Sequence, residues 1–162
     1  GILCLPGTHS KWAQISAGEV VSFQTYMTGE LFALLSESSV LRHGMQGGGW
    51  DEAAFDAGLS DAISRPDRIA SRLFALRAEG LIAGLAPPAA RARLSGLLIG
   101  IELAAARPYW LGQRVTLIGA EPLAAAYDRA LKTQGVEAER LAVTDCTLVG
   151  LASLAPQPEA AR

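Results

Sequence analysis

The distribution of apolar and polar residues predicts three strands at the start of the chain. Residues 2–5 form a continuous apolar run, which is typical of a short buried strand. Pro6-Gly7 signals a turn, and apolar and polar residues then alternate from 12 to 16. After a second turn, β-branched and aromatic residues dominate 20–26. The chain is therefore expected to open with two consecutive hairpins.

Helical spacing dominates the pattern after position 28. The expected helices cover 28–41, 51–59, 66–80, 87–107, 122–134 and 145–154. Two short apolar runs, 115–118 and 141–143, are expected to be strands. The tail 157–162 is predicted to be frayed, because it follows a proline and lacks apolar periodicity.

Several helix ends carry recognisable capping signals. Thr28, Asp51 and Asp145 are predicted N-caps, and Ser64 with Asp67 has the spacing of a capping box. Prolines mark two helix starts, at Pro87-Pro88 and at Pro122. Glycines mark two helix ends, at Gly80 and at Gly135.

The order of these elements predicts an α/β fold. Three strands and a helix come first, then a helical insert at about 45–110, and then strand, helix, strand and helix. Without the insert this order is βββαβαβα, the ribonuclease H-like arrangement found in actin-like ATPases and sugar kinases. Those proteins carry two such domains facing one cleft.

Composition narrows the class of protein. The 162 residues suit one domain, half of them are hydrophobic and 19% are charged, which excludes a disordered chain. The net charge of −2 argues against a nucleic-acid partner. No apolar run is long enough to span a membrane, and Cys4 and Cys146 fit reduced thiols of a cytoplasmic protein. Because the chain starts with Gly1 inside an expected buried strand, we interpret it as a fragment whose front half is missing.

Candidate chemistry gathers at the tip of the first hairpin. Gly7, Thr8, His9, Ser10 and Lys11 combine an open backbone, two hydroxyls and a cation, a set that suits an anion with several oxygens. The alternative is an ordinary polar turn, in which His9 bonds locally and Lys11 is solvated.

Two further stretches are candidates for ligand contacts. The strand 115–118 runs through Gly119 and Ala120 into a helix, a common way to present backbone amides to phosphate or ribose oxygens. Gly96 and Gly100 share one helix face, which indicates either close helix packing or room for a ligand.

Specific segments resemble the 2-dehydro-3-deoxygalactonokinase family. The most specific are Leu5–Trp12 and Phe23–Leu35, and Leu73–Arg77, Leu94–Leu103 and Leu117–Ala120 agree in the right order. The resemblance covers nearly the whole chain. It departs after Leu35, where a His-Ser-Ile-Leu-like segment is expected and Ser-Ser-Val-Leu stands instead.

This resemblance implies an ATP- and Mg²⁺-dependent cytoplasmic kinase that phosphorylates the 6-hydroxyl of 2-dehydro-3-deoxy-D-galactonate. It also implies a two-domain protein, with residues 1–162 as the second, nucleotide-side domain. The absent first domain would hold a phosphate loop, most sugar contacts and the catalytic base, which match no position here.

The resemblance also suggests roles for individual residues. The expected phosphate-binding residues are Gly7, Thr8, His9, Ser10 and Lys11. The expected adenosine-binding residues are Gly119, Ala120, Pro122 and Gly96. Glu30 is either an indirect Mg²⁺ partner or simply a favourable charge at a helix start. The open alternatives for function are another carbohydrate kinase, a non-catalytic nucleotide-binding domain and a plain interaction domain.

Overall fold

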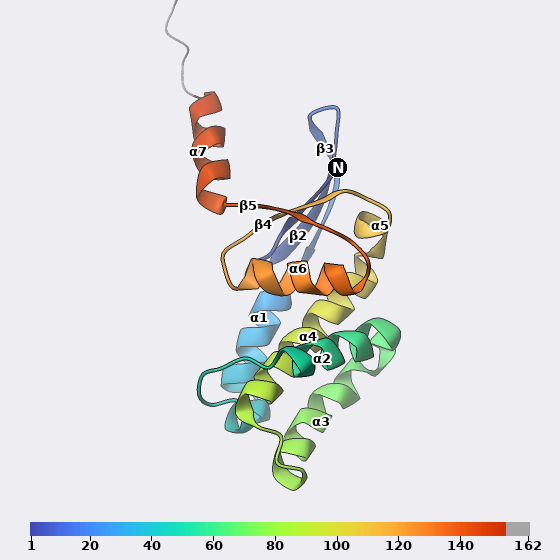
Figure 1. Cartoon of the computed structure of the whole chain (residues 1–162), viewed down its shortest axis with the longest axis vertical. Helices are drawn as coiled ribbons and strands as arrows, with labels where there is room; N and C mark the ends of the chain where they lie inside the picture. Colours follow the sequence, from blue (N-terminus) through green and yellow to red (C-terminus); the bar gives the residue numbers. More distant parts are fainter. Residues whose placement is uncertain (155–162) are drawn as a thin grey trace, which may run out of the picture.

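A computed structural model describes residues 1–154 and contains a five-stranded mixed sheet (Figure 1). The strands are β1 (Ile2–Leu5), β2 (Ser10–Ser16), β3 (Glu19–Tyr26), β4 (Val115–Ile118) and β5 (Glu139–Leu141). Their order is β3-β2-β1-β4-β5, with antiparallel pairs among the first three strands and parallel pairs β1–β4 and β4–β5. The expected α/β class is confirmed, whereas the predicted frayed tail lies outside the described residues.

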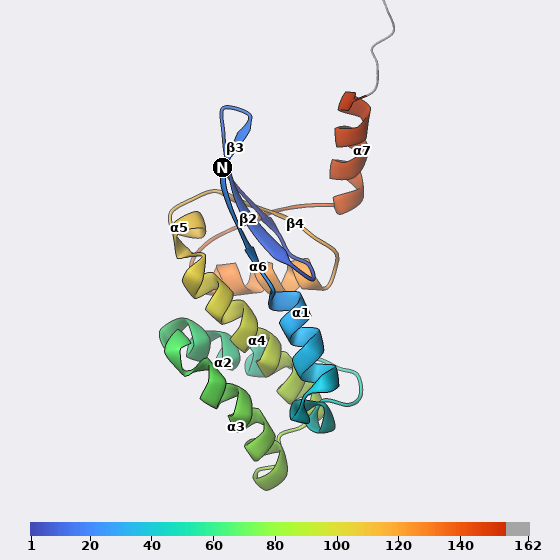
Figure 2. The ribbon, with the colours of Figure 1, turned by 180° about the vertical axis from the view of Figure 1, so that it is seen from behind.

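Helices cover one side and one end of this sheet. Their bounds are α1 (Thr28–Ala33), α2 (Glu52–Ser64), α3 (Ile69–Ile82), α4 (Pro87–Ala105), α5 (Arg107–Trp110), α6 (Leu123–Thr133) and α7 (Val143–Leu154). A π-helical turn, Leu34–Ser38, and a 3-10 helix, Val40–Gly44, continue α1, and a short 3-10 helix, Pro66–Arg68, precedes α3. Both views show α6 crossing the sheet and α7 standing apart (Figures 1 and 2).

Some of the predicted helix signals are confirmed. The Asp51 carboxylate accepts a hydrogen bond of 2.9 Å from the Ala54 amide and caps α2. The proline pair begins α4 as expected, and Gly135 adopts a positive φ of 75° after α6.

Three of the capping predictions are wrong. Thr28 is the first residue of α1, and its hydroxyl donates to Glu102 instead of capping the helix. Ser64 ends α2 and caps nothing, because a separate 3-10 helix precedes α3. The last strand lies at 139–141, two residues before the expected run, so α7 begins at Val143 and Asp145 lies within its first turn. In addition, α3 continues past Gly80 to Ile82.

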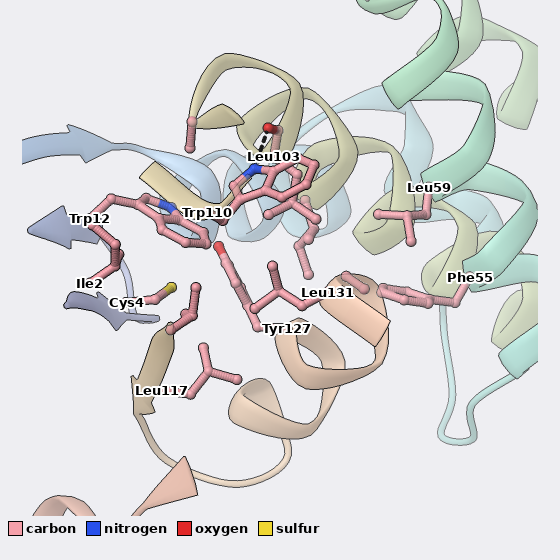
Figure 3. Close-up of a cluster of buried hydrophobic side chains, with 14 of the residues drawn as sticks. Ile2, Cys4, Trp12, Phe55, Leu59, Leu103, Trp110, Leu117, Tyr127 and Leu131 are labelled. Atoms are coloured by element: carbon pink, nitrogen blue, oxygen red, sulfur yellow. Dashed lines mark hydrogen bonds between the residues drawn. The ribbon is translucent and has the colours of Figure 1, made fainter. Parts of the chain in front are cut away.

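The main core lies between the sheet and the helices. Alternate residues of β1 and β4 face it, namely Ile2, Cys4, Val115 and Leu117. Trp12 of β2 and Tyr127 of α6 meet there, and Figure 3 shows both beside Trp110. The Trp110 indole N–H donates to the Leu103 carbonyl at 2.8 Å, so this buried polar group has a partner.

Glycines allow α2 and α4 to pack with their backbones in contact. A Cβ added to Gly96 would lie 2.1 Å from the Phe55 carbonyl oxygen, and one added to Gly58 would lie 2.4 Å from that of Arg93. At Gly100 an added Cβ would lie 2.7 Å from the Ala62 Cβ. The surroundings of Gly96 therefore match the helix-packing explanation, and Gly96 is not among the residues that line the pocket described below.

Candidate nucleotide-binding site

Two glycine-containing bends meet at one edge of the sheet. Because β1 and β4 are parallel neighbours, their carboxyl ends lie together at this edge. The bend after β4 touches the turn after β1, since a Cβ added to Gly119 would lie 3.2 Å from the Pro6 Cδ. The structure therefore brings together the two bends that the sequence places more than a hundred residues apart.

A pocket of about 840 Å³ opens beside these bends. One wall is the turn after β1 together with the start of α1, and the opposite wall is the first two turns of α6. The α4 helix and the segment before α2 complete it. Its lining includes Gly7, Thr8, Thr28, Phe32, Trp50, Glu52, Arg91, Ser95, Pro122, Tyr127 and Arg129. Its volume is in the range of small-molecule sites, about 300–1,000 Å³.

The hairpin tip contributes its first two residues to this pocket. Gly7 and Thr8 line it, and a Cβ added to Gly7 would meet nothing within 4 Å, so the backbone there is open to a ligand. Ser10 is completely buried and donates its hydroxyl to Glu102 at 2.6 Å. The Ser10 hydroxyl is therefore directed into the core, and Ser10 is not among the residues that line the pocket.

The two basic residues of the tip bond locally. The His9 Nε2 lies 2.5 Å from a carboxylate oxygen of Glu30, and both side chains are partly exposed. Lys11 donates from its Nζ to the His9 carbonyl oxygen at 3.0 Å. Neither His9 nor Lys11 lines the pocket, and the geometry matches the local-bonding alternative for His9.

Of the four residues predicted to bind adenosine, one lines the pocket and three do not. Pro122 lines the pocket as the residue preceding α6. Gly119 lies against Pro6 and does not line the pocket. Ala120 is exposed to solvent and does not line the pocket either. Gly96 faces α2, as described above.

Aromatic and cationic residues of the pocket were not predicted from the sequence. Trp50 is 47% exposed, and its ring centroid lies 5.3 Å from that of Phe55. The Arg91 guanidinium carbon lies 4.8 Å from the centroid of the Phe32 ring, within cation–π range. The available signal was the spacing of Arg91 and Ser95, which stand four residues apart and so share a face of α4.

Comparison with known proteins decides the family. The sequence profile described as 2-keto-3-deoxy-galactonokinase matches residues 1–154. The chain belongs to this family.

Individual relatives of this kinase family agree over nearly the whole chain. A Rhizobium meliloti protein named as a probable 2-dehydro-3-deoxygalactonokinase is 36% identical over 159 residues, which is 95% of this chain and 52% of that protein. The Escherichia coli 2-dehydro-3-deoxygalactonokinase is 35% identical over 152 residues, or 93% of this chain and 52% of that protein. The chain therefore spans about half the length of these relatives.

A solved structure shows the same arrangement. A Sinorhizobium meliloti protein, described in its crystal structure as a putative 2-dehydro-3-deoxygalactonokinase, superposes with a TM-score of 0.88 at 35% identity. The match covers 94% of this chain and 52% of that protein. The mixed α/β fold is thus shared with a relative in the kinase family.

In this member of the kinase family, a cluster of ion pairs connects α6 to α2 at one side of the pocket. Arg129 of α6 donates to both carboxylate oxygens of Asp56, at 2.7 and 2.6 Å, and to Glu52 at 2.8 Å. The hydrogen bond from Arg129 lowers the pKa of Asp56, and the same bond raises the pKa of the Arg129 guanidinium. Since Glu52 and Arg129 both line the pocket, this cluster fixes α2 relative to α6.

The buried carboxylate of Glu102 lies behind the pocket, and it was not predicted from the sequence. Glu102 is 2% exposed and accepts hydrogen bonds from Ser10, Trp12, Thr28 and Tyr127. Burial, followed by the charge of Glu102, raises the pKa of the Tyr127 hydroxyl well above its usual value. The sequence carried a signal here, because Glu102 interrupts the apolar stripe of 94–103.

The described part of the chain contains neither a metal cluster nor a membrane helix. Over residues 1–154, no group of three or more His, Cys, Asp or Glu side chains has a metal-binding arrangement. None of the helices in that range has the length and apolar character needed to cross a bilayer.

Proposed function

We propose that this chain is the ATP-binding half of a kinase that phosphorylates the 6-hydroxyl of 2-dehydro-3-deoxy-D-galactonate. The observation that carries the proposal is the pocket at the carboxyl edge of β1 and β4, with an open glycine turn on one side and the start of α6 on the other. Phosphoryl transfer depends mainly on positioning and charge neutralisation, which such a pocket can supply. Membership of the kinase family supports this reading.

The ATP phosphates are placed at the Gly7–Thr8 turn. The open space above Gly7 admits a phosphate against the backbone, and the exposed Thr8 hydroxyl adds a donor. Arg91 is the cation that lines this pocket without a carboxylate partner among residues 1–154, and it replaces Lys11 as the proposed neutralising charge. Mg²⁺ would arrive on the phosphates themselves, which commonly supply several of its ligands.

The adenosine is placed between α6 and the segment before α2. Pro122 and the first turn of α6 form one side, as expected from the sequence, and Trp50 forms the other. The half-exposed Trp50 ring offers a face on which a base can stack, an arrangement that contributes about 1–3 kcal/mol for bases in other proteins. Ser95 on α4 supplies a hydroxyl at the pocket floor.

The ribonuclease H-like topology and the two-domain organisation belong to the same proposal. Three antiparallel strands followed by parallel β4 and β5 support that topology. Residues 1–162 would form the second domain, with the helical segment 45–110 as an insert. The other half of the protein would supply the sugar contacts and the catalytic base, and the exposed apolar residues of α7 (Leu148, Val149, Leu151 and Leu154) are consistent with a further covering domain.

A substrate panel on the full-length protein tests the reaction. ADP release should require ATP, Mg²⁺ and 2-dehydro-3-deoxy-D-galactonate, and other sugar acids should react more slowly. Turnover of a different carbohydrate alone would replace this proposal with another carbohydrate kinase. ATP binding without transfer to any sugar would indicate a non-catalytic nucleotide-binding protein. The isolated chain 1–162 should not turn over, because half of the proposed cleft is absent.

A glycine substitution tests the phosphate site. Gly7→Val should weaken ATP binding by about tenfold or more, because the side chain occupies the space next to the turn amides, while the fold is preserved. Gly44→Val is the matched control, since a Cβ there also meets nothing within 4 Å and the position lies outside this pocket. Calorimetric titration with ATP measures both, and an unchanged affinity in Gly7→Val would refute the phosphate assignment.

Tryptophan fluorescence tests the base site. Of the three tryptophans, Trp12 and Trp110 are buried and Trp50 is half-exposed in the pocket. ATP and adenosine should both change the emission, and Trp50→Phe should abolish the change. A signal that persists in Trp50→Phe would place the base elsewhere.

A further inference from the structure

A single buried carboxylate connects the elements behind the pocket. The Glu102 Oε2 accepts hydrogen bonds from Ser10 at 2.6 Å, from Tyr127 at 2.7 Å and from Thr28. Its Oε1 accepts one from the Trp12 indole at 2.8 Å. Within residues 1–154 it forms no ion pair, so hydroxyl and indole donors alone take the place of water around it.

Two of these donors line the pocket, and a third follows the Gly7–Thr8 turn in the sequence. Ser10 is the first residue of β2 and lies two positions after Thr8 in the hairpin tip. Thr28 at the start of α1 and Tyr127 on α6 line the pocket themselves. Glu102 sits on α4, which forms the floor, so its carboxylate joins the floor to both walls.

The turn and α1 are held together by direct backbone contact as well. The Glu30 amide donates to the Thr8 carbonyl oxygen at 2.9 Å. A Cβ added to Gly29 would lie 2.3 Å from the Gly7 carbonyl oxygen, so no side chain fits between them. A displacement of α1 away from Glu102 would therefore carry the Gly7–Thr8 turn with it.

We propose that Glu102 is a positioning residue for the ATP phosphates. Through Ser10 and Thr28 it holds the phosphate-side turn, and through Tyr127 it holds α6. Glu102 does not itself line the pocket, so it acts only through the groups it holds. This inference rests on the proposed ATP site and adds the residue that sets its geometry.

The comparison of two ligands separates positioning from a purely structural role. Loss of a positioning residue should weaken ATP, which contacts the turn, much more than adenosine, which does not reach it. Loss of general stability should affect both ligands alike.

The test substitution is Glu102→Gln in the full-length protein. Glutamine keeps the shape, its carbonyl can still accept from the Trp12 indole, and its amide can donate to two of the three hydroxyls, which rotate to accept. We expect the Kd for ATP to rise by about tenfold, because charge-assisted hydrogen bonds become neutral ones, with the Kd for adenosine changed by less than about twofold. In turnover, kcat should fall while the KM for the sugar acid is unchanged.

Two further variants keep the result interpretable. Ser10→Ala removes one hydroxyl that bonds Glu102 on the phosphate side, and Ser10 does not itself line the pocket, so this variant serves if Glu102→Gln fails to fold. It should also lower the affinity for ATP selectively. Leu76→Ala is the control for lost stability, because Leu76 is buried in the separate cluster formed with α3 and should leave the ATP-to-adenosine ratio unchanged.

The outcomes distinguish this inference from the proposed function. If the unaltered protein binds neither ATP nor adenosine, the nucleotide site is wrong and this inference is wrong with it. If it binds both, and Glu102→Gln or Ser10→Ala weakens them equally or not at all, the site stands and the positioning role is refuted.

Discussion

Replacing Gly96 by alanine tests whether backbone contact between α2 and α4 holds the helical part of the molecule together. The added Cβ would lie 2.1 Å from the Phe55 carbonyl oxygen, 2.9 Å from the Leu59 amide nitrogen and 3.0 Å from the Phe55 carbonyl carbon. All three atoms belong to the backbone of α2, so no side chain can rotate away. The two helices would have to separate by about 1 Å to restore an ordinary contact distance.

The size of the effect follows from two opposing contributions. Alanine in place of glycine favours a helix interior by about 1 kcal/mol. Overpacking a buried contact typically costs about 1–3 kcal/mol, and the upper end applies here because rigid backbone faces the new methyl group. We therefore expect Gly96→Ala to lower the free energy of unfolding by about 2 kcal/mol, which corresponds to a fall in Tm of about 4–8 °C for a domain of this size.

Thermal unfolding followed by circular dichroism measures the effect, and Gly80→Ala is the matched control. Gly80 lies within α3, and a Cβ there meets nothing within 4 Å, so only the helix propensity changes. That control should raise Tm by up to about 4 °C. If Gly96→Ala is as stable as the unaltered protein or more stable, the close approach of the two helices does not constrain the fold as described.

Two other predictions concern titration and reactivity. Asp56→Asn should lower Tm at neutral pH and have no effect below the lowered pKa of Asp56. The pKa of Asp56 is lower in the folded protein than in the unfolded chain, where it is about 3.9. The ionised carboxylate therefore stabilises the fold at pH values above about 3.9, and this stabilisation is lost as the pH falls through the lowered pKa. A loss of Tm that is equal at pH 2 and pH 7 would contradict this prediction. A thiol-specific disulfide reagent should label Cys146, which is partly exposed, and should label Cys4 only after unfolding, because burial raises the pKa of the Cys4 thiol; rapid labelling of two thiols in the native protein would be inconsistent with this.

Local signals in the sequence were sufficient for most of the fold. The apolar run 2–5, the alternation that follows it and the β-branched run 20–26 lie in β1, β2 and β3. Pro87-Pro88 and Asp51 marked helix starts correctly, because a proline in the first turn and a carboxylate cap act within a few residues of the chain. Parallel pairing of the strands at 2–5 and 115–118 places the two glycine bends that follow them at one edge of the sheet.

The capping errors show where local reasoning stops. Thr28 has the side chain of an N-cap, yet its hydroxyl bonds Glu102, which lies 74 residues away in sequence. Ser10 resembles a phosphate ligand in the sequence, but the same carboxylate draws it into the core. A hydroxyl takes the strongest acceptor within reach, and the fold decides which acceptor that is.

The sequence by itself determined the class of fold, the strand and helix order, the resemblance to a kinase family and the glycine turn beside the pocket. The tertiary structure alone decided that Gly96 serves helix packing and that Trp50 and Arg91 join the turn around one pocket. It alone also showed that Glu102 ties the pocket walls together. The reason is physical: periodicity and capping report interactions between near neighbours in the chain, whereas burial, close backbone approach and hydrogen-bond partners depend on segments that meet only after folding.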